Sequence, residues 1–232
     1  MNHNPFKALT KGEWALWIFS LCVVGVSSFF AGGAGILSTV ASLTGVTALI
    51  FVAKGDVYGQ LLTIIFSLLY GVVSIKFHYW GELITYVCMS LPAAFITMMS
   101  WLRHPYKDSN RVEIAHLTKG KILFAFASSA VATVVFYFIL RALSTPNLAF
   151  STLSVFTSFL ACVFLVLRLP YYALAYSAND VVLIVLWVLA ALKDVQYLPM
   201  IVCFSMFLVN DLYGFYNWRR MKRRQSLDIE QK

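Results

Sequence analysis

Eight long apolar stretches, separated by short polar connectors, constrain the fold of this chain more than any other feature. A helix needs about 20 predominantly apolar residues to cross the hydrocarbon core of a bilayer, and these stretches have about that length. They are too long and continuous for the alternating strands of a membrane barrel, so helices are expected. The predicted helical spans are 14–30, 36–53, 57–75, 83–102, 122–140, 148–167, 171–192 and 197–218.

The composition agrees with a membrane protein. Hydrophobic residues make up 60% of the chain and charged residues 12%, which leaves too little polar surface to cover a soluble globule. The first apolar stretch is followed by further ones, so we interpret it as a span and not as a cleaved leader. We therefore expect an all-α integral membrane protein with about eight transmembrane helices in a single membrane domain, residues 1–232.

The distribution of basic residues orients the predicted bundle. Of the 18 Lys and Arg residues, all but Lys76, Arg141 and Lys193 fall on the side of the N-terminus. The positive-inside rule then places both termini and the long connector after residue 102 in the cytoplasm. A basic segment such as 219–224 can bind nucleic acid, but we interpret it as an anchor at the lipid headgroups and expect no nucleic-acid partner.

Motifs for chemistry are missing from the sequence. There is no G-x-x-x-x-G-K-[ST] motif for a nucleotide-driven motor, and no Ser-His-Asp or Cys-His arrangement. The cysteines all fall within spans and the histidines in tails or loops, without the spacing of metal ligands. We expect no catalytic residue, no metal and no cofactor. The residues concerned are Cys22, Cys88, Cys162, Cys203, His3, His78, His104 and His116.

A weak internal repeat indicates how the spans are grouped. The second span carries Ser38-Thr39, Thr44 and Phe51, and the sixth span has the same residue types at the same spacing. Since three helices reverse the direction of the chain, a linking fifth span would restore it and leave two parallel triplets. The predicted parts are an N-terminal helix (1–35), a first triplet (36–102), a loop and linking helix (103–147), a second triplet (148–218) and a basic cytoplasmic tail (219–232).

Two Asn-Asp pairs, at 179–180 and 210–211, lie deep inside predicted spans. An ionisable side chain at that depth costs roughly 2.5 to 3.5 kcal/mol on insertion scales, so it usually faces a partner or a water-filled cavity. Polar and aromatic residues share helical faces with these acids, although each of them can instead form an interhelical hydrogen bond. The candidate substrate-binding residues are Ser67, Tyr70, Tyr172, Tyr176, Asn179, Asp180, Trp187, Asn210, Asp211, Tyr213 and Asn217.

The chemistry of these candidates favours a flat organic cation. Carboxylates and the faces of aromatic rings both attract positive charge in a dry site. Amide side chains would orient a ligand through hydrogen bonds to a sugar or a carboxamide. The residues alone therefore predict a small, polar, cationic ring compound as the cargo.

Short motifs in the spans resemble one known family. They are YLPM at 197–200, NDLYGFYNWRRM at 210–221, NDVVL at 179–183, LYG at 69–71 and YWGE at 79–82. Together they make residues 36–221 similar to the PnuC nicotinamide riboside transporter family.

The resemblance implies a 3+1+3 helical core related to SWEET sugar transporters, a homotrimer and facilitated diffusion of nicotinamide riboside through a bacterial cell membrane. It also implies a cytoplasmic kinase that traps the cargo by phosphorylation. Tyr172 and Tyr176 stand where the family has a tryptophan-rich cluster, so a carrier of another vitamin, such as thiamine, is an alternative. A membrane-embedded enzyme or a non-transporting subunit is the alternative from another class.

Overall fold

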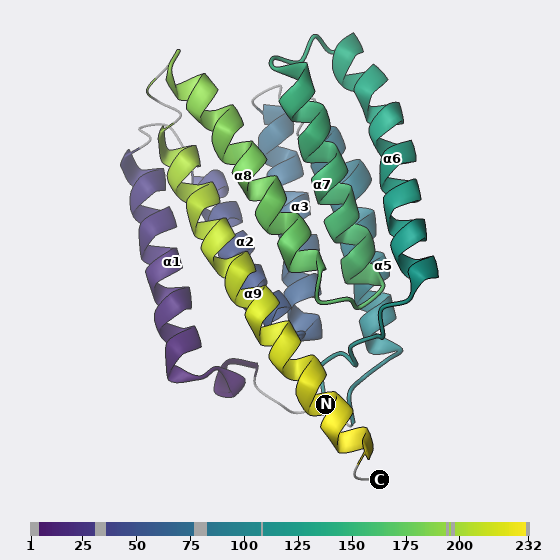
Figure 1. Ribbon diagram of the computed structural model, residues 1–232. Helices are drawn as coiled ribbons and strands as arrows, with labels where there is room; N and C mark the ends of the chain where they lie inside the picture. Colours follow the sequence, from purple (N-terminus) through teal and green to yellow (C-terminus); the bar gives the residue numbers. More distant parts are fainter. Residues whose placement is uncertain are drawn as a thin grey trace.

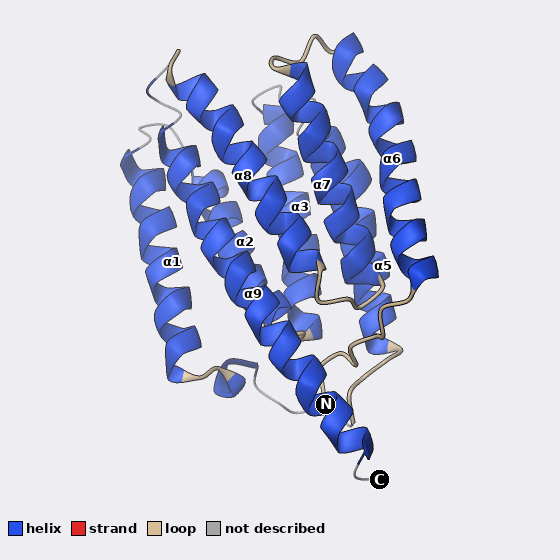
Figure 2. Ribbon diagram, viewed as in Figure 1, coloured by secondary structure: helices blue, strands red, loops and turns tan. Residues whose placement is uncertain are grey.

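The computed structural model describes residues 5–30, 36–76, 83–107, 109–193, 195 and 198–230. The connector at 31–35 and the motif at 79–82 lie outside these residues. The described chain folds as a bundle of roughly parallel and antiparallel helices (Figures 1 and 2). The elements are η1 (Pro5–Ala8), α1 (Lys11–Phe30), α2 (Ile36–Ala53), α3 (Val57–Lys76), η2 (Ile84–Ser90), α5 (Leu91–Leu102), α6 (Lys119–Ala142), α7 (Leu148–Val166), α8 (Tyr172–Ala191) and α9 (Leu198–Glu230).

The predicted all-α membrane architecture is confirmed. Each predicted span corresponds to one helix, or in one case to the continuous pair η2 and α5. Within the described residues, five segments are long and apolar enough to cross a membrane by length and composition. These segments are Val57–Ile75, Ile84–Leu102, Lys119–Ala142, Leu148–Val166 and Tyr172–Ala191.

The helices form two groups of three with one helix added at each flank (Figure 1). In the first group α3 packs against α2 and against η2 and α5, and in the second group α8 packs against α7 and α9. Contacts between α2 and α9 and between α5 and α7 join the groups. The linking helix α6 packs on α7, while α1 packs on α2 and α9. The chain therefore follows the expected order of an extra helix, three helices, a link and three helices.

A π-helical segment, η2, opens the fourth predicted span. Pro92 follows it at the start of α5. Proline has no N–H for the preceding turn and its ring collides with the carbonyl four residues back, so a regular α-helix cannot run through this position. The wider turn of the π-helix accommodates the proline ring.

The last helix is longer than expected. We predicted a tail from residue 219, but α9 continues past Trp218 to Glu230. One face of this extension is buried against the connector that follows α5. Gln225 Nε2 donates to Val112 O at 3.1 Å, and Gln225 Oε1 accepts from Ile114 N at 2.8 Å. Because these bonds satisfy backbone groups of the connector, the extension is ordered by the bundle itself.

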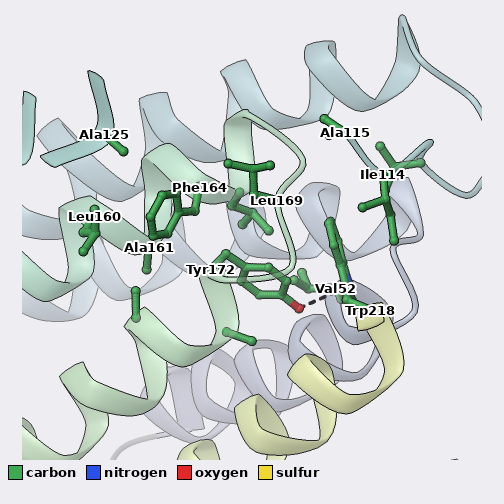
Figure 3. Close-up of a cluster of buried hydrophobic side chains, with 14 of the residues drawn as sticks. Val52, Ile114, Ala115, Ala125, Leu160, Ala161, Phe164, Leu169, Tyr172 and Trp218 are labelled. Carbon is green, nitrogen blue, oxygen red and sulfur yellow. Dashed lines mark hydrogen bonds between the residues drawn. The ribbon is translucent and has the colours of Figure 1, made fainter. Parts of the chain in front are cut away.

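An apolar cluster joins the helices at the end of the bundle where η1 and the last turns of α9 lie (Figure 3). Trp101, Trp218 and Leu169 are fully buried in it, and Tyr172 is 1% exposed. Trp218 Nε1 donates to Val52 O at 2.9 Å, and the Tyr172 hydroxyl points to the same carbonyl at 3.5 Å. The cluster thus fixes the end of α2 to α8 and α9.

Candidate functional site

The two acids of the predicted spans meet between α8 and α9. Asp180 is 3% exposed and Asp211 is 6% exposed, and their carboxyl groups are close enough to interact electrostatically. Asp180 Oδ2 has no hydrogen-bond partner in the described part of the chain. Neither of the two ion pairs found among the described residues involves these acids, so the pair offers an acceptor that no described cation neutralises through an ion pair.

Two tyrosines of α8 lie beside the carboxyl pair. The rings of Tyr172 and Tyr176 are edge-on to each other at 6.2 Å, and both side chains are within electrostatic range of Asp211. The Tyr176 hydroxyl is 3.2 Å from Cys162 Sγ on α7. Tyr172 fits closely against α9, because a Cβ at Gly214 would lie 3.0 Å from its hydroxyl. Aromatic surface therefore continues from the carboxyl pair toward the apolar cluster.

Asn179 and Trp187 extend the site along α8. Asn179 Oδ1 accepts a hydrogen bond from Thr157 Oγ1 of α7 at 3.0 Å, so its amide is oriented by the neighbouring helix. Trp187 lies two turns beyond Asp180 and stacks on Phe204 of α9, with ring centroids 6.5 Å apart and planes 15° apart. Flat aromatic faces therefore lie on both sides of the acids along α8.

A row of buried polar side chains on α3 was only partly foreseen. Gln60, Ser67 and Ser74 are each at most 1% exposed and follow one another at intervals of seven residues, so they share one face. Neither the Gln60 amide nor either hydroxyl has a hydrogen-bond partner in the described residues. Leaving such groups unpaired costs roughly 1 to 3 kcal/mol each, so a row of them is typical of a surface that a ligand or water contacts. The interval of seven, present in the sequence, would have identified Gln60 and Ser74.

Tyr70, the other candidate on α3, belongs to an aromatic group. Its ring lies 4.4 Å from that of Tyr86 in η2, and Phe66 meets the Tyr86 ring edge-on at 5.5 Å. The π-helical segment thus contributes a ring next to the predicted α3 residues. Nothing in the sequence pattern had selected Tyr86.

The remaining candidates, on α9, face α1 and the end of α2. Asn210 Nδ2 donates to Ser20 Oγ of α1 at 3.0 Å, while its Oδ1 has no partner in the described chain. The Tyr213 hydroxyl donates to Glu13 Oε1 at 2.5 Å, and Asn217 Nδ2 donates to Ala53 O at 2.8 Å. For these three residues the structure therefore shows the interhelical hydrogen bonds that the sequence analysis gave as the alternative to substrate binding.

Glu13 and Ser20, the partners of this stripe on α1, were not selected from the sequence. Glu13 is 2% exposed and forms an ion pair with Lys54 at 2.9 Å, close to the end of α2. Glu13 lies at the boundary of an apolar stretch, where charged residues are common, and Ser20 is a single hydroxyl inside that stretch, so neither position carried a signal. No group of three or more His, Cys, Asp or Glu suited to a metal occurs in the residues that the structure describes.

Comparisons with known proteins agree on one group. The family model described as nicotinamide mononucleotide transporter matches residues 35–220. The nicotinamide riboside transporter PnuC of Neisseria mucosa is 27% identical over 224 residues, which cover 93% of this chain and 85% of the relative. The protein of the same name from Haemophilus influenzae is 23% identical over 213 residues, with 91% of each chain covered.

A solved structure is also similar throughout its length. It is the crystal structure of the vitamin B3 transporter PnuC, with a TM-score of 0.79, 26% sequence identity and 94% of both chains covered. The helix order described above is therefore that of a known membrane transporter. Because the match covers 94% of this chain, it extends into the extra helix α1.

Proposed function

Because this chain belongs to the nicotinamide mononucleotide transporter family, we propose that it carries nicotinamide riboside across a bacterial cell membrane by facilitated diffusion. The proteins named above are transporters, two of them called nicotinamide riboside transporters and both bacterial. A transporter, not an enzyme, is also what the buried site favours, since its acids lie within the helices of the bundle and away from either end.

The observation that carries the proposal is the buried pair of Asp180 and Asp211 next to tyrosine rings. Nicotinamide riboside contains a pyridinium ring with a fixed positive charge. Negative charge on this carboxyl pair attracts the ring, and the aromatic faces of Tyr176 and Trp187 stabilise it further. The amide of Asn179 is available for a ribose hydroxyl or the carboxamide.

We assign the transport pathway to the residues that the sequence predicted, with additions from α3. Tyr213 and Asn217 would extend it toward the cluster around Trp218, where they also hold α9 against α1 and α2. The buried amide of Gln60 and the hydroxyl of Ser74 are the additions. The full proposed set is Gln60, Ser67, Tyr70, Ser74, Tyr172, Tyr176, Asn179, Asp180, Trp187, Asn210, Asp211, Tyr213 and Asn217.

The site favours the riboside over the mononucleotide. A phosphate would bring negative charge to Asp180 and Asp211, and α8 and the part of α9 before Arg219 contain no Lys or Arg to compensate it. Like charges in a low-dielectric environment repel strongly. The same argument supports trapping of the cargo by a cytoplasmic kinase, because a phosphorylated product could not return.

Further parts of the proposal concern assembly and orientation. We propose a homotrimer whose protomers each have two parallel triplets, 36–102 and 148–218, in a SWEET-like arrangement with the linking helix between them. Both termini and the loop that begins at 103 would face the cytoplasm, in accordance with the excess of cations at that end of the bundle.

The proposal predicts transport by the protein alone. Purified protein in liposomes should equilibrate labelled nicotinamide riboside without ATP and should not concentrate it, because the sequence has no nucleotide-binding motif. Thiamine and nicotinamide mononucleotide serve as competitors, and the mononucleotide should compete least. If thiamine competes better than the riboside itself, the choice of vitamin is wrong. Uptake above equilibrium that depends on a proton gradient would contradict facilitated diffusion and identify the two acids as a proton relay.

A second prediction concerns the carboxyl pair. Asp180→Asn should weaken riboside binding by about 1 to 3 kcal/mol, roughly 5- to 150-fold, because an amide hydrogen replaces the unpartnered carboxylate oxygen that faces the cation. Asp180→Asn combined with Asp211→Asn should lose at least as much, since no negative charge remains. Isothermal titration calorimetry in detergent measures both.

The matched control for the carboxyl pair is Asp228→Asn, which makes the same change at the end of α9 where Asp228 pairs with Lys107. Its affinity for the riboside should equal that of the unmodified protein. Unchanged affinity in the double variant would assign the two acids to helix packing.

A further inference from the structure

A recess of about 360 Å³ lies at the end of the bundle, outside the site described above. It is formed between Pro170 and Tyr171, just before α8, and the extension of α9 beyond Trp218. Three cations of α9, Arg219, Lys222 and Arg223, line it. The recess is therefore bounded by two elements whose positions are fixed by the apolar cluster.

The three cations share one face of a helix that is held in orientation. Lys222 and Arg223 follow Arg219 by three and four residues, so all three cations lie within about one turn. A neighbouring face of the same segment is buried, with Trp218 fully covered and Gln225 bonded to the connector after α5. Because the helix cannot rotate, these cations are directed into the recess.

Nothing in the described chain neutralises this positive charge. No acidic side chain lines the recess, and the two ion pairs of the described residues, Lys54 with Glu13 and Lys107 with Asp228, do not include its cations. Like charges at these spacings destabilise a helix. The helix dipole favours cations only in the last turn of α9, and this segment lies before that turn, so the dipole does not offset the repulsion. An anion from outside the chain would relieve this repulsion.

The geometry of one cation also fits an anion site. The Arg219 guanidinium lies 5.5 Å above the Phe215 ring, and the Tyr171 ring is 6.3 Å from the same phenylalanine. The aromatic contact holds the guanidinium plane while leaving its N–H groups available. Arginine in a fixed orientation binds the oxygens of a phosphate in pairs.

The depth of the recess indicates where the phosphate comes from. The apolar part of α9 ends at Trp218, so Arg219 through Arg223 lie where the bilayer changes from hydrocarbon to headgroups. Tyr171, 38% exposed, and Leu227, 50% exposed, give the opening an apolar edge suited to the glycerol and upper acyl carbons of a lipid. Basic recesses at the cytoplasmic surface of helical bundles attract anionic headgroups. We propose that this recess is a binding site for a phosphate diester, supplied by the headgroup of an anionic phospholipid.

Adjacent arginines allow a matched test. Arg223 lines the recess, whereas Arg224, exposed on the same turn, does not. Arg223→Gln and Arg224→Gln therefore remove the same charge from neighbouring positions, and only the first changes the recess. The full-length protein is purified in a neutral detergent, and binding of phosphatidylglycerol and of phosphatidylcholine is measured by titration with native mass spectrometry.

The expected result is saturable binding of phosphatidylglycerol, which Arg223→Gln weakens about tenfold or more and Arg224→Gln leaves nearly unchanged. Arg219→Gln should weaken it similarly. Equal losses in the two adjacent variants would show a diffuse electrostatic attraction and overturn the site. A third arm uses inorganic phosphate: if it binds with the same dependence on Arg223 while phosphatidylglycerol shows no advantage over phosphatidylcholine, the lipid assignment is overturned.

Discussion

Replacement of Trp218 by alanine is expected to lower the free energy of unfolding by about 3 to 5 kcal/mol. This is the range for truncating a fully buried aromatic side chain, because the loss of apolar contacts adds to the cost of the cavity left behind. Trp218 is 0% exposed, and its ring lies 5.5 Å from that of Trp101 and 4.8 Å from that of Tyr172. It therefore joins α5, α8 and α9 at one point.

A more conservative change separates packing from hydrogen bonding at this point. Trp218→Phe keeps most of the ring contacts but removes the donor to Val52 O, which the Tyr172 hydroxyl still approaches at 3.5 Å. The free energy of unfolding is expected to fall by only about 1 kcal/mol in this variant, since one hydrogen bond is removed and Val52 O keeps the Tyr172 hydroxyl as a donor. Unfolding by SDS in mixed micelles, followed by far-ultraviolet circular dichroism, measures both variants. Equal losses in the two would show that the hydrogen bond, not the ring packing, dominates.

The helices and their order were predictable from the sequence for a simple physical reason. In a bilayer every backbone group must be hydrogen-bonded within the protein, and a long, continuous apolar stretch achieves this as a helix. The predicted span 36–53 has the same bounds as α2. The extension of α9 was missed, because the segment after Trp218 is polar and its helix is held by contacts with Val112 and Ile114, far away in the sequence.

The candidate site was predictable to a smaller extent. The cost of burying Asp180 and Asp211 pointed to them without any knowledge of their neighbours, and the structure brings the two together. Helical periodicity groups residues on a face but does not say which helix that face meets. For this reason the contact of Tyr213 with Glu13, and the unpaired amide of Gln60, required the folded chain.

The helix α1 shows how a segment outside the family match, which begins at residue 35, is tied to the core. Glu13 accepts hydrogen bonds from Lys54 Nζ at 2.9 Å, from the Tyr213 hydroxyl and from Thr10 N at 2.6 Å. One carboxylate thereby joins α1 to the end of α2 and to α9. Because Lys54 and Glu13 are 9% and 2% exposed, water cannot replace either partner when the other is removed.

Lys54→Met is therefore expected to destabilise the protein by about 3 to 5 kcal/mol, the cost of leaving a buried charge unpaired. In Lys54→Met combined with Glu13→Gln, most of that loss should be recovered, because no charge remains to be compensated and the introduced amide oxygen can still accept from Tyr213. Unfolding in mixed micelles of the unmodified protein, Lys54→Met, Glu13→Gln and the double variant gives the four free energies of a double-mutant cycle. The matched control is Lys107→Met, which breaks the ion pair with Asp228, whose side chains are 60% and 41% exposed. An exposed pair of this kind contributes about 0 to 1 kcal/mol. If Lys54→Met costs no more than Lys107→Met, the pair is hydrated and does not hold α1 to the core, and Tyr213 would then be free to turn toward the transport pathway.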